Sequence, residues 1–158
     1  MLRKDRAERV MERLTCDQLL VSDPLSIYYL CERMIHPGER FFGLLLRRNA
    51  EPILYINELF RFDEDLGVEK KYFSDIDDVA ELVGKDTDSH SPLGVDKILP
   101  ARFLLPFMEK GIASSFVNGS LAVDHTRAVK DESEIELMRE SSRINDAAME
   151  QFKGLIHD

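Results

Sequence analysis

Two strand-like apolar runs in the first third of the chain constrain its fold more than any other feature. Residues 41–46 and 52–56 are almost entirely apolar, and the short, mostly polar link 47–51 separates them. Two such runs joined by a short link predict a β-hairpin, and therefore an antiparallel pair of strands. Elsewhere strand-like runs alternate with helical patterns, which is typical of α/β folds. Together these signals predict a mixed β-sheet of about five to six strands flanked by helices.

The remaining elements follow from local signals. A charged helix with one apolar edge is expected over residues 2–14, and a buried strand over residues 18–21. Asp23 is the expected N-cap of a short helix that has Pro24 in its first turn. Further along, the pattern predicts strands at residues 71–73, 92–95 and 112–117, helices at residues 75–83 and 100–110, and a loop at residues 85–91.

Composition excludes several classes of protein. The 158 residues suffice for one domain with a sizeable core. The formal net charge of −9 argues against nucleic acid as a partner, because phosphate binding requires a basic surface. Cys16 and Cys31 are too few for a disulfide framework, and both are expected to be buried and reduced. The sequence shows neither a signal peptide nor an apolar run that could span a membrane, so a cytoplasmic location and no membrane partner are expected.

The C-terminal thirty residues have a helical rhythm of their own. Asp131 followed by Glu134 is a capping-box pattern, with acids where the helix dipole favours them. Two apolar stripes then cover roughly half of the circumference, more than a surface helix of a small domain needs. One stripe is Ile135, Met138, Met149, Phe152 and Ile156, and the other is Leu137, Ile144, Ala148 and Leu155. Two alternatives stay open: both stripes pack on this domain, or one of them contacts a partner.

Two separated stretches carry a resemblance to known proteins. The first is Val-Ser-Asp-Pro-Leu-Ser-Ile-Tyr-Tyr-Leu at residues 21–30, followed by Pro-Gly-Glu-Arg and an apolar run at residues 37–46. The second is Arg127-X-X-Lys130 and the acid-capped helix that follows it. In this order and spacing, they resemble the N-terminal domain of the creatinase/prolidase/aminopeptidase P family, closest to the prolidase (Xaa-Pro dipeptidase) branch.

The chain departs from the family pattern in its short helix. The family has Asn-Ile-X-Tyr-Leu-Thr-Gly, whereas this chain has Ser26 in place of the Asn and Cys31-Glu32 in place of the Thr-Gly. Without the glycine, a left-handed turn is no longer free of steric cost at residue 32. The geometry of the loop 32–36 is therefore expected to be unusual, and with it any substrate specificity that the loop confers.

The resemblance implies a domain organisation and a fold. Residues 1–126 would form the creatinase-type N-terminal domain, of ribonuclease H-like architecture. Residues 127–158 would form the linker and first helix of a catalytic "pita-bread" domain that this sequence does not include. In the family, that second domain holds two divalent metal ions (manganese, cobalt or zinc) and hydrolyses the bond before proline in short peptides.

The same resemblance implies what this chain does. It is expected to be inactive alone, with no catalytic residue, metal ligand or cofactor of its own. Its expected roles are homodimerisation and shaping the substrate pocket of the partner subunit. Its expected partners are a second copy, its own catalytic domain and proline-containing short peptides.

Arg33, His36 and Arg40 are the candidate substrate-binding residues. They lie between the short helix and the strand at residues 41–46, in a segment that faces the active site of a neighbouring subunit in relatives. A cation there could pair with the C-terminal carboxylate of a short peptide. The alternative is a solvated polar loop without a binding role.

Other polar residues fit structural roles. The histidines His36, His90, His125 and His157 show no metal-ligand spacing. The densest carboxylate cluster is Asp75, Asp77 and Asp78. It stands at the expected start of a helix, where capping explains acids better than acid–base chemistry does.

Two other functions stay open. The chain could be a catalytically silent protein-interaction module of the same fold, or the N-terminal half of a creatinase-like hydrolase that cleaves a non-peptide C–N bond. A fold alone does not decide between them.

Overall fold

The computed structural model describes residues 1–156, and the chain divides into two compact units. The first unit is Met1–Thr126, and the second begins at Arg127. The strands are β1 (Gln18–Val21), β2 (Phe42–Arg47), β3 (Ala50–Asn57), β4 (Glu69–Phe73), β5 (Leu93–Val95) and β6 (Phe116–Asn118). The helices are α1 (Lys4–Arg13), α2 (Pro24–Cys31), the 3-10 helix η1 (Glu58–Phe60), α3 (Val79–Gly84), α4 (Ala101–Glu109), α5 (Ser120–Ala128) and α6 (Glu132–Lys153).

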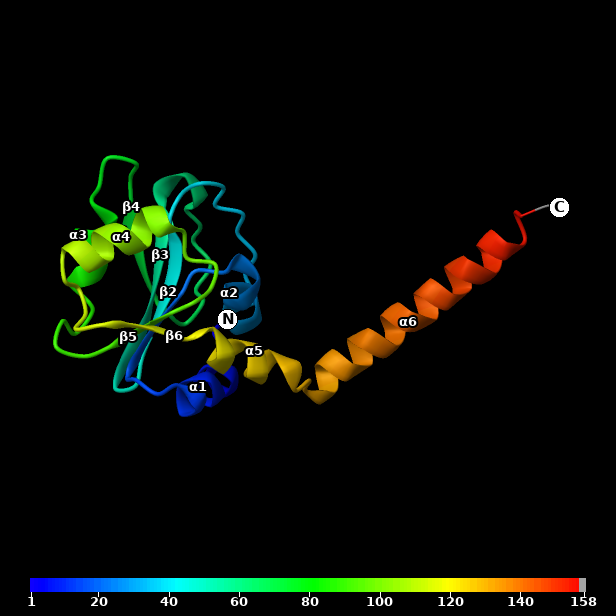
Figure 1. Cartoon of the computed structure of the whole chain (residues 1–158). Helices are drawn as coiled ribbons and strands as arrows, with labels where there is room; N and C mark the ends of the chain where they lie inside the picture. Colours follow the sequence, from blue (N-terminus) through cyan, green and yellow to red (C-terminus); the bar gives the residue numbers. More distant parts are fainter. Residues whose placement is uncertain (157–158) are drawn as a thin grey trace. The chain divides into compact units, whose positions relative to one another are not determined.

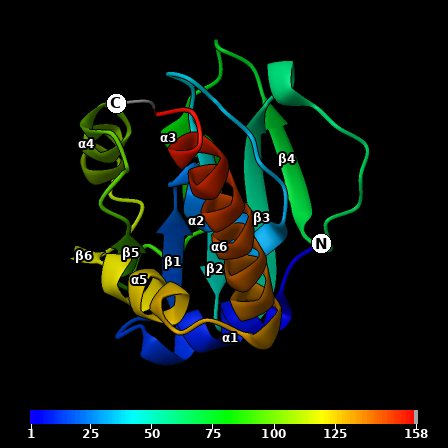
Figure 2. The ribbon, with the colours of Figure 1, turned by 90° about the vertical axis from the view of Figure 1, so that its right-hand side faces the viewer.

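The first unit is built on one mixed sheet with strand order β4-β3-β2-β1-β5-β6, and Figure 2 shows the strands in this order. The predicted hairpin is present, since β2 pairs antiparallel with β3, and β1 also pairs antiparallel with β2. The other three pairs, β3–β4, β1–β5 and β5–β6, are parallel. The α/β class and the mixed, helix-flanked sheet are therefore confirmed.

Side chains alternate along the strands and divide the core into two clusters, one on each face of the sheet. On β1, Leu19 and Val21 join the cluster that includes residues of α1, α2 and α5. Leu20, between them, joins the cluster that includes residues of α3 and α4. Figure 1 shows α3 and α4 on one side of the sheet and α1 and α2 on the other. A strand buried on both faces explains why residues 18–21 show no polar alternation.

Phe41 anchors the chain just before β2. Its ring packs edge-on against Phe103 and Phe107 of α4, with centroids 5.2 and 5.8 Å apart. Tyr55 and Phe73 complete the group, each with its ring centroid 6.2 Å from that of Phe41. Edge-to-face pairs add to the free energy gained by burying the rings. Phe41 therefore fixes the point at which the preceding loop enters the sheet.

A buried carboxylate joins the ends of β1 and β5. Asp96 follows β5 directly and is 8% exposed. Its Oδ2 accepts hydrogen bonds from the backbone N–H groups of Ser22 (2.6 Å) and Asp23 (2.8 Å). Its Oδ1 accepts from the Ser22 hydroxyl (2.6 Å) and from the N–H groups of Ile98 (3.1 Å) and Leu99 (3.0 Å). One side chain therefore satisfies five donors where two parallel strands end.

The predicted helix 75–83 begins later than expected. Residues 74–78 form a turn, and α3 starts at Val79 with Asp78 as its N-cap. The Asp77 carboxylate accepts hydrogen bonds from the backbone N–H (2.6 Å) and the hydroxyl (2.7 Å) of Ser74. Short polar side chains that bond to nearby backbone groups compete with helix formation, which explains the delayed start.

The predicted strand 112–117 is wrong over residues 112–115, since β6 begins at Phe116. Gly111 ends the preceding turn at φ 61°, and the N–H of Ile112 returns to the carbonyl of Phe107 (3.2 Å). Ladder pairing starts only where Phe116 lies opposite Leu93. The sequence pattern also missed α5, whose first N–H groups include that of Ser120, bonded to Asn118 Oδ1 (2.9 Å). It gave no expectation for η1 either, and the remaining elements lie close to their predicted bounds.

In the second unit, α6 starts as its sequence predicts. The N–H of Glu134 donates to the Asp131 carboxylate, and the N–H of Asp131 donates to the Glu134 carboxylate, both at 2.9 Å. The capping box is therefore confirmed. Within the second unit, no residue of α6 is buried, so this unit alone does not cover either apolar stripe.

We expect Asp96→Asn to lower the free energy of unfolding by about 2–4 kcal/mol, measured by urea denaturation. The substitution removes the charge that strengthens five hydrogen bonds and turns an amide donor toward buried donors. Asp124→Asn is the matched control, because the Asp124 carboxylate pairs with Lys97 at the surface and should cost less than about 1 kcal/mol. Equal losses in the two variants would contradict the structural role of Asp96.

Candidate functional site

The three candidate residues lie on the segment between α2 and β2, and α2 determines where this segment begins. The Asp23 carboxylate accepts from the N–H groups of Leu25 (3.2 Å) and Ser26 (3.1 Å), as an N-cap does. Ser26, which stands where the family has Asn, adds a hydroxyl bond to the same carboxylate (2.6 Å). The predicted cap is therefore confirmed, and the departure at Ser26 leaves the start of the helix intact.

Glu32 ends α2 in the left-handed conformation, with φ 55° and ψ 21°. It is the one residue other than glycine with positive φ in the part of the chain that the structure describes. This conformation costs an L-residue about 1–2 kcal/mol. The Glu32 N–H donates to the Tyr28 carbonyl (2.7 Å), and its carboxylate lies 3.5 Å from Arg3 Nη1. The loss of glycine thus leaves the turn in place but strained.

The segment then crosses the surface between two buried anchors. Ile35 and Phe41 are buried, whereas His36, Gly38 and Glu39 are exposed. A tight turn closes where the Arg40 N–H donates to the Pro37 carbonyl (3.1 Å), and Gly38 supplies its positive φ of 61°. Figure 1 shows this segment, η1 and the link from β4 to α3 at the same end of the sheet.

Arg40 is held by a carboxylate across this end of the sheet. Its Nε and Nη2 donate to the two oxygens of Asp75 at 2.8 and 2.7 Å. Asn57, which is 2% exposed, donates through Nδ2 to the same Asp75 Oδ1 (2.8 Å). The hydrogen bond and charge of Arg40 hold the pKa of Asp75 below its usual value. We call Arg40, Asp75 and Asn57 the Arg40 clamp.

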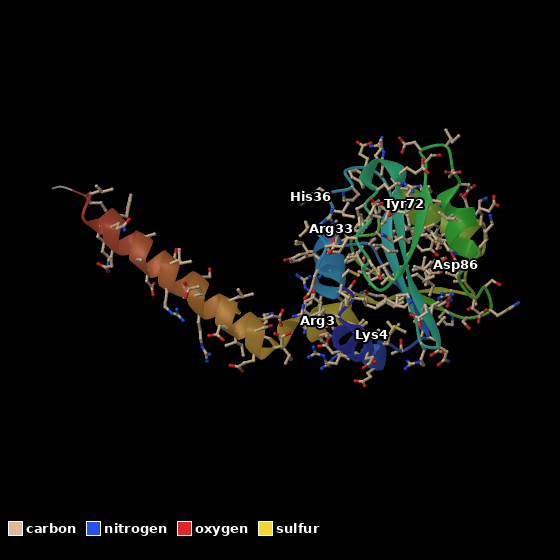
Figure 3. All side chains as sticks on the ribbon, turned by 180° about the vertical axis from the view of Figure 1, so that it is seen from behind. Arg3, Lys4, Arg33, His36, Tyr72 and Asp86 are labelled. Carbon is tan, nitrogen blue, oxygen red and sulfur yellow. The ribbon has the colours of Figure 1, made fainter. Side chains whose placement is uncertain are left out.

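Arg33 is paired as well. Its Nη1 lies 3.3 Å from Glu64 Oε2, and its guanidinium lies over the ring of Phe62, 4.9 Å from the centroid. His36 is exposed and forms no hydrogen bond or ion pair with the described residues. Figure 3 shows Arg33 and His36 on the same side of the domain, away from Asp86. Of the three candidate residues, Arg33 and Arg40 are therefore paired with carboxylates, and His36 has no partner among the described residues.

The three clustered acids have three separate tasks. Asp75 belongs to the Arg40 clamp, Asp77 holds Ser74, and Asp78 caps α3 and pairs with Lys110 at 2.8 Å. Only Asp78 therefore fulfils the capping role predicted for all three. Within residues 1–156, no group of three or more His, Cys, Asp or Glu side chains could hold a metal ion. His157 lies outside these described residues.

Sequence reasoning missed a polar network around Asp86. The Asp86 carboxylate accepts from the Tyr55 hydroxyl (2.8 Å) and from Lys71 Nζ (2.6 Å). Burial, with the hydrogen bond to Asp86, raises the pKa of Tyr55. The one available signal was that β4 has two adjacent lysines, Lys70 and Lys71, at half-buried positions. The network joins β3 and β4 to the residues after α3, which is a structural task.

Cys16 and Cys31 are free and buried, as predicted. Burial raises the pKa of the Cys31 thiol to about 12. A thiolate nucleophile is therefore disfavoured at this position.

Comparison with known proteins identifies a family. A family model, the creatinase/prolidase N-terminal domain, matches residues 3–129. No curated protein sequence matches the chain.

Solved structures match in fold at low identity. A dipeptidase from Pyrococcus horikoshii OT3 is 20% identical with a TM-score of 0.79, and the match covers 97% of this chain and 44% of that one. A prolidase from Thermococcus sibiricus is 19% identical with a TM-score of 0.77, over 95% and 42% of the two chains. The creatinase/prolidase N-terminal domain of an X-Pro dipeptidase from Streptococcus pyogenes is 16% identical with a TM-score of 0.60, over 73% and 92%. The chain thus spans less than half of the first of these proteins.

Glu32→Gly should raise the free energy of unfolding by about 0.5–1 kcal/mol, because glycine removes the left-handed strain at some cost in chain entropy. Thermal and urea unfolding would measure the gain. Glu32→Ala is the control, since it keeps the Cβ and loses the contact with Arg3, and it should bring no gain. A gain of equal size in the alanine variant would show that the carboxylate, and not the backbone, is the source of strain.

Proposed function

Because this chain belongs to the creatinase/prolidase N-terminal domain family, we propose that it is the non-catalytic N-terminal domain of a proline-specific metallopeptidase of the Xaa-Pro dipeptidase type. The family match over residues 3–129 is the observation that carries the proposal. The folds of the Pyrococcus horikoshii dipeptidase and the Thermococcus sibiricus prolidase support the same branch of the family.

The catalytic centre would lie on another part of the full-length protein. Family enzymes use a two-metal centre, and the donor set of the described residues does not fit one. The carboxylates of Asp75, Asp77 and Asp78 already serve internal hydrogen bonds. We therefore assign no chemical step to this chain and infer that it is inactive alone.

The role of this domain would be to complete the substrate pocket of a partner subunit in a homodimer. His36 is exposed and unpaired among the described residues, and Arg40 keeps Nη1 without a partner there. Both groups could donate to the C-terminal carboxylate of a short proline-containing peptide. Arg33, paired with Glu64 and stacked on Phe62, would support this position more than bind directly.

The cellular location of the protein is part of the same proposal. Among residues 1–156, no helix combines the length and the apolar character that crossing a membrane requires. Both cysteines are free, as is usual in a reducing compartment. We propose a cytoplasmic location.

A second candidate is a catalytically silent interaction module. Within the second unit, large apolar side chains of α6 such as Leu137, Ile144 and Phe152 are not covered by other residues of that unit. Exposed apolar patches mark interaction surfaces in many proteins. This candidate differs from the first in requiring no peptidase activity of the full-length protein.

Hydrolysis of Xaa-Pro dipeptides with added Mn²⁺, measured for this chain and for the full-length protein of its gene, tests the proposal. We expect activity only in the full-length protein, and a dimer in sedimentation experiments. His36→Ala in the full-length protein should raise KM about 3–10-fold with little change in kcat, because a carboxylate contact is lost in the ground and transition states alike.

The other outcomes decide between the alternatives. Activity in this chain alone would overturn the inference that it is inactive. If neither protein hydrolyses Xaa-Pro dipeptides, the interaction module is favoured.

A further inference from the structure

The Arg40 clamp indicates a role for Asp75 beyond that of a surface ion pair. Its three members come from separate parts of the chain: Asn57 ends β3, Asp75 follows β4, and Arg40 closes the turn that leads into β2. Asn57 is fixed in turn, because its Oδ1 accepts from the N–H of Leu59 (3.1 Å). A buried amide therefore orients the carboxylate, and the carboxylate orients the guanidinium.

The clamp leaves a defined part of Arg40 open. A guanidinium presents three nitrogens, and its Nε–Nη2 edge matches the two oxygens of a carboxylate. Asp75 occupies this edge at 2.8 and 2.7 Å. Nη1 is the one nitrogen of the Arg40 side chain without a partner among the described residues, and the side chain is 37% exposed. A ligand carboxylate would meet Nη1, with the second N–H of Nη2 beside it.

The turn that carries Arg40 is held from a second side as well. Arg102 of α4 donates to the carbonyl of Glu39, and its Nη1 lies 3.6 Å from the Glu39 carboxylate. A side chain already held by two hydrogen bonds, as Arg40 is by Asp75, is preorganised, so less entropy is lost when it binds. Without Asp75, both the Arg40 side chain and the neighbouring turn would gain freedom.

We propose that Asp75 is a positioning residue: it fixes Arg40 so that Nη1 meets the C-terminal carboxylate of a peptide substrate. This inference rests on the proposed function. It makes Asp75 a determinant of preference for free peptide carboxylates, although Asp75 itself does not contact the substrate.

The first test uses this chain and does not depend on activity. In Asp75→Asn, amide hydrogen exchange at Arg40 and its neighbours in residues 36–40 should be about 3–10-fold faster than in the wild type. Asp63→Asn is the matched control, since it makes the same charge change on the exposed link before β4, where Asp63 has no partner among the described residues. Unchanged exchange in Asp75→Asn would overturn the clamp.

The second test uses the full-length protein and two ligands. For Asp75→Asn, KM for an Xaa-Pro dipeptide should rise about 5–10-fold, with kcat within about twofold. The inhibition constant of the matching Xaa-Pro amide, which lacks the carboxylate, should stay within about twofold of the wild type. Asp75→Glu, which keeps the charge and both oxygens, should recover most of the dipeptide affinity.

The outcomes separate the two proposals. Equal weakening toward dipeptide and amide would mean that Asp75 only supports the fold, which overturns the positioning role. A wild-type full-length protein without any Xaa-Pro hydrolysis would overturn the proposed function and the substrate role together. Faster exchange in Asp75→Asn would then still support the clamp as a structural device.

Discussion

The buried carboxylate of Asp96 is the interaction on which the rest of the domain depends. β1 and β5 are parallel neighbours, and both end where this side chain lies. A parallel pair leaves backbone N–H groups at its carboxyl end, and any such group that is buried must find an acceptor. Asp96 accepts from residues on both sides of the junction, including Ser22 and Asp23. The direction in which the chain leaves β1 is therefore set by β5.

The position of the candidate site depends on Asp96 through a series of contacts. Asp23, held by Asp96, caps α2, and α2 places Glu32 at the start of the exposed segment. At the other end, Phe41 enters an aromatic group between the sheet and α4. The residues between these anchors belong to a loop, but a rigid scaffold positions them, as is common for binding residues. Arg40 adds the third attachment through Asp75.

Local signals predicted most of the fold, and the polar contacts that hold the candidate site together escaped them because they are long-range. The hairpin, the Asp23 cap and the capping box at Asp131 depend on residues close in sequence, so their patterns are visible. Asp96 and Ser22 are 74 residues apart, and Arg40 and Asp75 are 35 apart. Such pairs leave no periodic signal. The candidate residues on the segment were identified by resemblance, but their partners Glu64 and Asp75 could not be predicted.

The two edge strands of the sheet, β4 and β6, limit how the domain can associate. β6 is only three residues long, and β4 carries Glu69, Lys70 and Lys71 in its five. The link before β4 also folds over its side chains, since Lys70 Nζ and the Tyr72 hydroxyl both donate to the Phe62 carbonyl. Edge strands that are short, charged or partly covered resist the addition of another strand and the aggregation that follows from it. Assembly of this domain would therefore proceed through side-chain surfaces, and the sheet itself would stay closed to further strands.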